Sequence, residues 1–144
     1  MITQGQCGSF RAELLNGYHA FSSAYRPADT FKIALYTSVA DLNPATTTVY
    51  TTVGEVSGAG YVAGGKVLAP TAPANVGTVA YLSFANVVWT TASFTANGAL
   101  IYNASQGNRA VCILAFGGDK TPVGSTFTVV FPVNDATNSV LRLY

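Results

Sequence analysis

Charge is scarce in this sequence. Only 9% of its 144 residues are charged, against about 25% in an average soluble domain. The net charge is +1, and the arginines and lysines are scattered singly between Arg11 and Arg142. Because direct binding of nucleic acid needs clustered cations that displace counterions from phosphates, we expect no nucleic-acid ligand. A surface so poor in charge consists largely of uncharged side chains, and we expect a partner to cover part of it.

Long apolar runs are also missing. The longest candidate, Ala110 to Phe116, has the length of a strand, whereas a membrane span needs about 20 apolar residues. The N-terminal stretch MITQGQCGSFRAELL contains no basic region followed by an apolar core, which is the pattern of a secretory signal. These absences predict a soluble protein that is made in a cytoplasm and does not enter a membrane.

Cysteine and histidine are too few for a closed zinc site without several carboxylates. A disulfide between Cys7 and Cys112 stays open, but a chain without a secretory signal favours free thiols, and the apolar neighbours of Cys112 predict a buried, reduced side chain. His19, the only histidine, follows a predicted helix end, and no Gly-x-Ser-x-Gly elbow occurs. We interpret His19 as a surface or interface residue rather than a general base. We expect no catalytic residue, metal or cofactor.

The glycine-rich stretch GAGYVAGGKV, residues 58–67, partly matches two phosphate-binding motifs. A dinucleotide fold needs a helix after the glycines and an acidic residue about 20 positions later, and a P-loop needs Ser or Thr after its lysine. Here Pro70 and Pro73 oppose a helix, Val67 replaces the hydroxyl, and no further acid occurs before Asp119. We interpret the stretch as a pliable turn segment in which glycine adopts positive φ.

Alternating residues predict strands from Thr30 onward. In FKIALYT, residues 31–37, the alternation has the period of a half-buried strand. Residues 99–116 are typical of a hairpin with a polar tip and a buried second arm. Residues 41–52 carry a turn at Asn43-Pro44 and then a Thr-rich strand candidate. Further strand candidates, bounded by turn residues, are 78–84, 87–89, 93–102, 110–116, 126–131 and 139–143. Such spacing predicts an all-β fold, a single antiparallel β-sandwich domain over residues 1–144, with a jelly roll as one form of it.

The first 22 residues are predicted to form an N-terminal arm and a short helix. Residues 1–8 show no periodicity, whereas Ser9 can cap a helix that stops at Asn16-Gly17. The apolar residues at helical spacing are Phe10, Leu14 and Leu15. Packing of this helix on the protein's own sandwich and contact with a neighbouring molecule both fit the pattern.

Aromatic residues are abundant and leave a second function open. Eight Tyr, eight Phe and one Trp could line a carbohydrate groove. Most of them fall at strand-like positions, where packing in the core or at an interface explains them. A glycosidase also needs two carboxylates on either side of a sugar, and the six acids form no evident pair.

Seven short motifs follow one another along nearly the whole chain. In order they are CGSFRAELLNGYH (7–19), DTFKIALYTS (29–38), EVSGAGYVAGG (55–65), GALIYN (98–103), NRAV (108–111), FGGDK (116–120) and FPVNDATN (131–138). In this order they resemble a family of small virion proteins of tailed bacteriophages. The resemblance covers most of the sequence, and it provides no catalytic residue to carry over.

The resemblance implies a structural role in the virion. A capsid cement or decoration protein fits first, bound to the major capsid protein on the outside of the head and associated with itself as a dimer or trimer. A tail or head-to-tail component is the next choice, and a carbohydrate-binding virion protein is a further alternative. We expect the helix and the glycine-rich turn to supply protein contacts, and the candidate interface residues are Phe10, Leu14, Leu15, Tyr18, Tyr61 and Lys66.

Overall fold

The computed structural model describes residues 1–144 and contains ten strands and one short helix. In chain order the elements are β1 (Gly5–Gln6), α1 (Gly8–Leu15), β2 (Phe31–Tyr36), β3 (Lys66–Leu68), β4 (Ala74–Val76), β5 (Val79–Leu82), β6 (Val87–Ala92), β7 (Ala96–Asn103), β8 (Arg109–Lys120), β9 (Ser125–Val129) and β10 (Leu141–Leu143).

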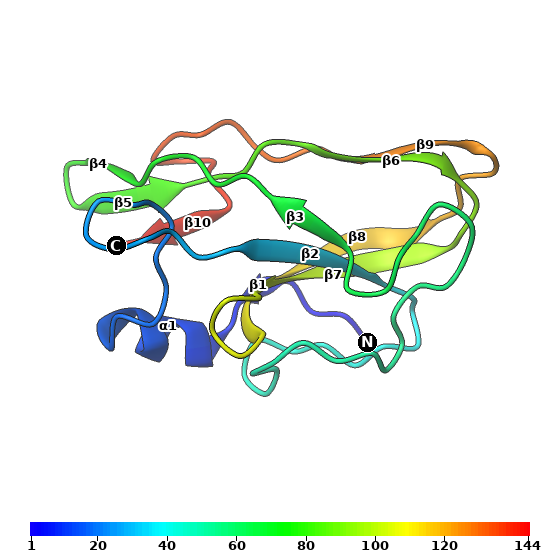
Figure 1. Cartoon of the computed structure of the whole chain (residues 1–144), viewed down its shortest axis with the longest axis horizontal. Helices are drawn as coiled ribbons and strands as arrows, with labels where there is room; N and C mark the ends of the chain where they lie inside the picture. Colours follow the sequence, from blue (N-terminus) through cyan, green and yellow to red (C-terminus); the bar gives the residue numbers. More distant parts are fainter.

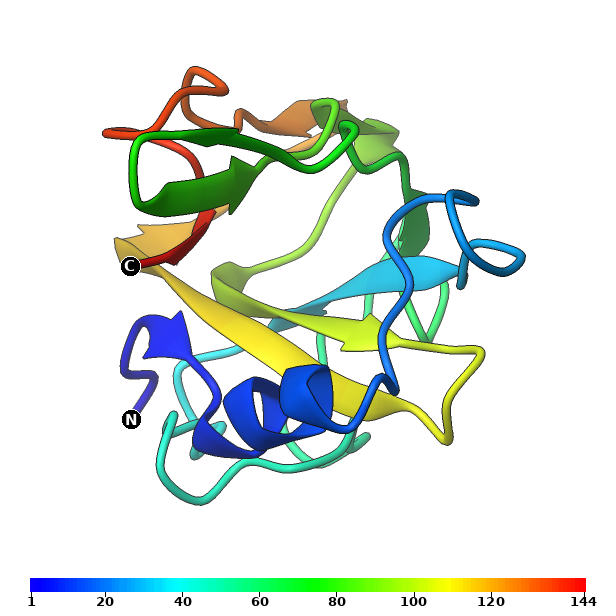
Figure 2. The ribbon, with the colours of Figure 1, turned by 90° about the vertical axis from the view of Figure 1, so that its left-hand side faces the viewer.

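The strands form two layers (Figure 1). The sheet β1-β8-β7-β2-β3 is one layer, and the sheet β10-β5-β4 together with the pair β6-β9 forms the other. All pairings are antiparallel, and α1 lies on the far side of the large sheet (Figure 2). This confirms the predicted all-β sandwich with one short helix. Its division into sheets of five, three and two strands differs from an eight-stranded jelly roll.

Strand β2 is buried on both faces, whereas its alternation predicted a half-buried strand. Ile33 and Leu35 are fully buried, and so are Ala34 and Tyr36, which point to the opposite face. The small sheets lie over one face, and the connection 37–65 runs along the other (Figure 1). This connection contributes Ala40, Leu42 and Val56 to the same hydrophobic core, so the large sheet has no face left to solvent along β2.

The N-terminal arm packs on its own sheet. The terminal amine donates to the Ala40 carbonyl at 2.9 Å, and the Thr3 N–H donates to the Leu42 carbonyl at 2.9 Å. Strand β1 then pairs with β8, with Gln6 opposite Cys112. The arm therefore packs on the protein's own sandwich, and contact of this N-terminal segment with a neighbouring molecule stays a prediction.

Two local predictions are wrong. The turn predicted at Asn43-Pro44 is present, but the Thr-rich residues that follow it up to 52 form no strand, because their backbone makes isolated bridges such as Val49 with Arg109 instead of a continuous ladder. Ser9 does not cap α1: Cys7 occupies the N-cap without a side-chain hydrogen bond, and the Ser9 hydroxyl is buried without a partner. The predicted stop is confirmed, since Asn16 is the C-cap and Gly17 has φ +74°.

The hairpin β7–β8 confirms the prediction for residues 99–116. Its strands pair from Asn103 with Arg109 back to Ala96 with Lys120, around a tip of turn residues. Its second arm is buried from Ala110 to Ile113. Cys112 within it is a free, buried thiol, as is Cys7.

Candidate functional site

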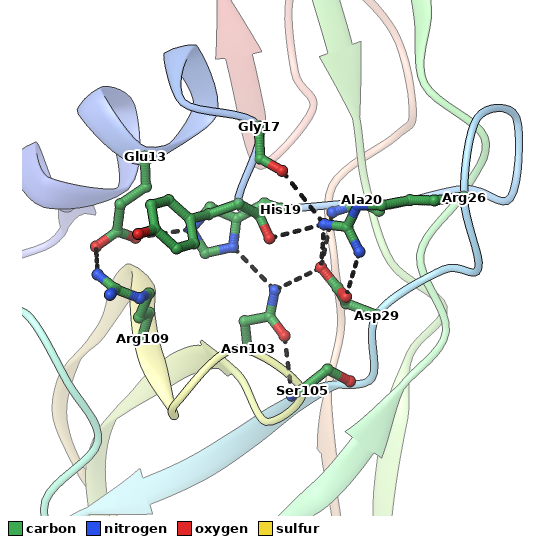
Figure 3. Close-up of polar contacts among 10 residues, drawn as sticks. Glu13, Gly17, His19, Ala20, Arg26, Asp29, Asn103, Ser105 and Arg109 are labelled. Carbon is green, nitrogen blue, oxygen red and sulfur yellow. Dashed lines mark hydrogen bonds and ion pairs between the residues drawn. The ribbon is translucent and has the colours of Figure 1, made fainter.

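A network of buried and partly exposed polar side chains connects α1, the segment after it and the β7–β8 hairpin (Figure 3). His19 and Glu13 share a hydrogen bond of 2.7 Å, and Arg109 pairs with the other Glu13 oxygen at 2.9 Å. The His19 side chain has no exposed surface, and its ring lies 5.0 Å from the Phe10 ring. The interpretation of His19 as a surface or interface residue is therefore wrong, because the chain turns back over Phe10 after Gly17 and buries the imidazole.

Asn103 fixes how the imidazole is oriented. Its amide nitrogen donates to His19 Nδ1 at 3.0 Å and to Asp29 Oδ2 at 2.9 Å, while its amide oxygen accepts from the Ser105 N–H at 3.0 Å. An amide nitrogen can only donate, so Nδ1 of His19 accepts and Nε2 carries the proton that it donates to Glu13. Both nitrogens of the only histidine thus have partners within the chain.

Asp29 is the most heavily bonded carboxylate of the network. It accepts from Arg26 at 2.9 and 3.1 Å, from the Ala20 N–H at 2.8 Å, from Asn103 at 2.9 Å and from Gln106 at 3.2 Å. Burial opposes its ionisation, but these donors outweigh burial and hold the pKa of Asp29 well below its usual range. Asp29 is therefore a charged, internally satisfied group.

The network holds segment 17–29 in place, and its geometry suits a structural role for His19. A general base needs a free nitrogen within reach of a substrate proton, and both nitrogens here are bonded to Glu13 and Asn103. Sequence reasoning missed these partners because Asn103 is 84 residues from His19 and 74 from Asp29. The one available signal was the scarcity of charge, which makes each retained carboxylate a candidate for an internal role.

An apolar cleft of about 530 Å³ lies beside this network. One wall comes from α1 and residues 17–26, including Phe21, and the other comes from β5 and β10, including Tyr81 and Leu141. At the rim Tyr25 is fully exposed and Leu143 is 45% exposed. By holding segment 17–29, the network positions one wall of a recess that suits an apolar group.

Four of the six predicted interface residues lie on or just after α1. Phe10 and Leu14 line the apolar cleft, and Phe10 is also part of the core with 1% exposure. Leu15 is 91% exposed and does not line the apolar cleft. Tyr18 is 40% exposed, and the Arg109 guanidinium lies 4.4 Å from its ring centroid. The helix therefore presents Leu15 and part of Tyr18 outward, while Phe10 packs inward.

The other two, Tyr61 and Lys66, form a separate group around Trp89. The Tyr61 ring stacks 6.4 Å from Trp89, and the Lys66 ammonium lies 5.7 Å from the Trp89 ring centroid. The Tyr61 hydroxyl donates to Glu55 at 2.6 Å. Neither residue lines the apolar cleft, so the structure does not bring the predicted set into one surface.

The glycine-rich segment 58–67 is a turn segment, as predicted, but it is firmly anchored. Gly60, Gly64 and Gly65 have φ of +83°, +91° and +77°, and strand β3 follows directly. The Glu55 carboxylate accepts from the Gly64 N–H at 2.7 Å and from two tyrosine hydroxyls at 2.6 Å each. A Cβ on Gly65 would lie 1.8 Å from the Ile33 carbonyl oxygen. The expectation of a pliable loop is wrong, because this backbone is packed against β2.

Three further observations concern metal ions, membranes and known proteins. No group of three or more His, Cys, Asp or Glu side chains is arranged to hold a metal ion. No helix is long and apolar enough to span a membrane. Comparison of the chain with protein-family models, curated proteins and solved structures finds no match. A function is therefore proposed from the residues and their geometry.

Proposed function

We propose that the protein is a non-enzymatic structural protein of a tailed-phage virion. In this proposal it is a capsid cement or decoration protein that binds outside the head, across subunits of the major capsid protein. The order of seven motifs supports the phage origin. The observation that carries the mode of action is the apolar cleft with Tyr25 and Leu143 exposed at its rim, since burying such apolar surface against a partner is favourable.

The placement of charge also supports a protein contact. Three of the six carboxylates, those of Glu13, Asp29 and Glu55, make hydrogen bonds that are at least partly buried. A partner that docks on the remaining surface therefore strips water from few ions, which is the costly part of forming an interface. The surface that remains is rich in valine and small polar residues, and it fits against another protein at low desolvation cost.

A modest contact is sufficient for a protein that is repeated over a shell. A standard interface buries about 800 Å² on each partner, roughly a tenth of the 7265 Å² surface of this chain. A dimer or trimer that grips several neighbouring subunits gains affinity from effective concentration. Because the protein would bind the assembled shell better than its separate subunits, it would stabilise the shell by mass action.

Co-sedimentation with capsids that lack the protein tests this proposal. We expect the protein to pellet with the capsids and to raise the temperature at which they break open. Replacing Tyr25 by Ser should weaken binding at least tenfold, because it removes an aromatic side chain from the rim of the apolar cleft. The variant should still fold, because this side chain is fully exposed and contributes little to folding. Val123→Ser is the matched control, since Val123 is 83% exposed and does not line the apolar cleft.

The outcomes distinguish the cement role itself from the place of the contact on the protein. If the unmodified protein stays in the supernatant at micromolar concentration, the cement role is wrong. If it pellets but Tyr25→Ser and Val123→Ser bind equally well, the role stands and the contact lies elsewhere than the apolar cleft.

A further inference from the structure

The four arginines of the chain fall into two pairs with different surroundings. Arg26 and Arg109 each pair with a carboxylate at 2.9 Å, those of Asp29 and Glu13. Arg11 and Arg142 make no ion pair. Both of these line one cleft of about 540 Å³, called here the arginine cleft, between the β1–β8 edge and residues 129–144. The two unpaired arginines, 131 positions apart in sequence, thus face one recess.

No acidic side chain lines the arginine cleft, since none of its 18 lining residues is Asp or Glu. Asp135 is near enough for the Arg142 charge to act on it, but the Asp135 oxygens are bonded to Asn138 and to the Thr137 N–H, and the residue does not line the cleft. The charged side chains that line the recess are therefore both positive.

The remaining walls suit an extended protein segment. Strand β1 covers β8 only at Cys112 and Ile113, so β8 from Leu114 onward has no strand partner on that side. Phe116, Val130 and other apolar side chains line the recess beside amides such as Gln4. Nucleic acid fits poorly, since a phosphate backbone needs a longer series of cations than two arginines.

We propose that the arginine cleft binds an acidic, extended segment of a partner protein. Carboxylates of the segment pair with Arg11 and Arg142, because the planar guanidinium matches a carboxylate in two-point geometry. Apolar residues between the carboxylates contact Phe116 and Val130. The inference is a property of the isolated chain and does not depend on the virion role, so its failure would leave that role untouched.

Calorimetric titration with a synthetic pentapeptide, acetyl-FEEFE-amide, tests the proposal. We expect measurable binding at low salt, at least tenfold tighter than for the peptide acetyl-FQQFQ-amide. The double variant Arg11→Gln/Arg142→Gln should lose at least tenfold in affinity. The matched control is Lys32→Gln/Lys120→Gln, which removes the same charge from half-exposed and exposed positions outside the cleft and should bind within about twofold of the unmodified protein.

Three results would overturn the proposal. They are absence of binding to the acidic peptide, equal weakening by both double variants, and tighter binding of a single-stranded oligonucleotide that the arginine variant also abolishes. The second result would mean attraction by net charge alone, and the third would make the partner a nucleic acid. Unchanged thermal unfolding of the arginine variant establishes that a loss of binding arises at the cleft.

Discussion

Replacing Asp29 by asparagine should destabilise the protein strongly. The carboxylate accepts five hydrogen bonds. Two come from the terminal nitrogens of Arg26, and one each comes from Ala20, Asn103 and Gln106. Asparagine keeps one acceptor oxygen and turns an NH₂ group toward the other donors. Bonds to charged groups contribute about 1.5–3 kcal/mol each, and Arg26 is 37% exposed and can turn to water, so we expect a loss of about 3 kcal/mol. For a chain of this size that lowers Tm by roughly 10 °C.

Thermal unfolding followed by circular dichroism at pH 7 measures this loss. The control is Asp41→Asn, because the Asp41 side chain is 92% exposed and its change should cost less than about 0.5 kcal/mol. If both variants melt alike, the network does not stabilise the fold as described.

The Asp29→Asn variant also tests how the free energy of unfolding depends on pH. The pKa of Asp29 is held below its unfolded value, so the contribution of this group is fully present above about pH 4 and is lost as the pH falls further. The difference between the unmodified protein and Asp29→Asn in urea unfolding should therefore begin to shrink near the unfolded pKa, at about pH 4, and continue to shrink as the pH falls to 3. A difference that stays constant down to pH 3 would contradict the assignment of the ionised, hydrogen-bonded carboxylate.

Three other changes test the packing of the chain. Gly65→Ala should lower the free energy of unfolding by more than about 2 kcal/mol, because its Cβ would overlap a β2 carbonyl. Gly77→Ala, also at positive φ but with nothing within 4 Å, should cost about 1 kcal/mol. Equal losses in urea unfolding would refute the overlap. Glu55→Gln should cost about 2 kcal/mol, because it weakens three hydrogen bonds, and a loss below 0.5 kcal/mol in thermal unfolding would refute their role. Burial, and then the Glu13 charge, raise the pKa of Cys7 to about 11, and burial raises the pKa of Cys112. Neither thiol should therefore react with a disulfide reagent at pH 8 until urea unfolds the chain. Fast reaction of the folded protein would place a thiol at the surface.

The sequence predicted the class of fold because local patterns encode it. The hairpin of residues 99–116 was predictable from two apolar arms around a polar tip, and both arms pair as expected. The Thr-rich segment 41–52 has strand propensity, yet it covers the outer face of the large sheet without forming a ladder. Strand β2 has the right extent but the wrong burial, because alternation within a strand does not reveal a second covering layer.

The candidate site was much less accessible from sequence. Phe10 and Leu14 were predicted as contact residues from helical spacing, and the structure places both on the apolar cleft. The His19 network was not predictable, since hydrogen bonds between residues 84 positions apart depend on the complete topology. The pairing of some arginines and not others depends in the same way on long-range contacts. The phage role itself comes from the motif resemblance and stays a prediction.

The number of copies of this chain in purified virions tests the proposed function most directly. Under the proposed function the chain is encoded by a phage, and quantitative gel densitometry of the purified particles, calibrated against the major capsid protein, measures this number. A cement protein repeated over the head should be present in hundreds of copies, which is an order-of-magnitude expectation for a component that binds wherever capsid subunits meet. A handful of copies would place the chain in the tail, and its absence from the particles would contradict the structural role altogether.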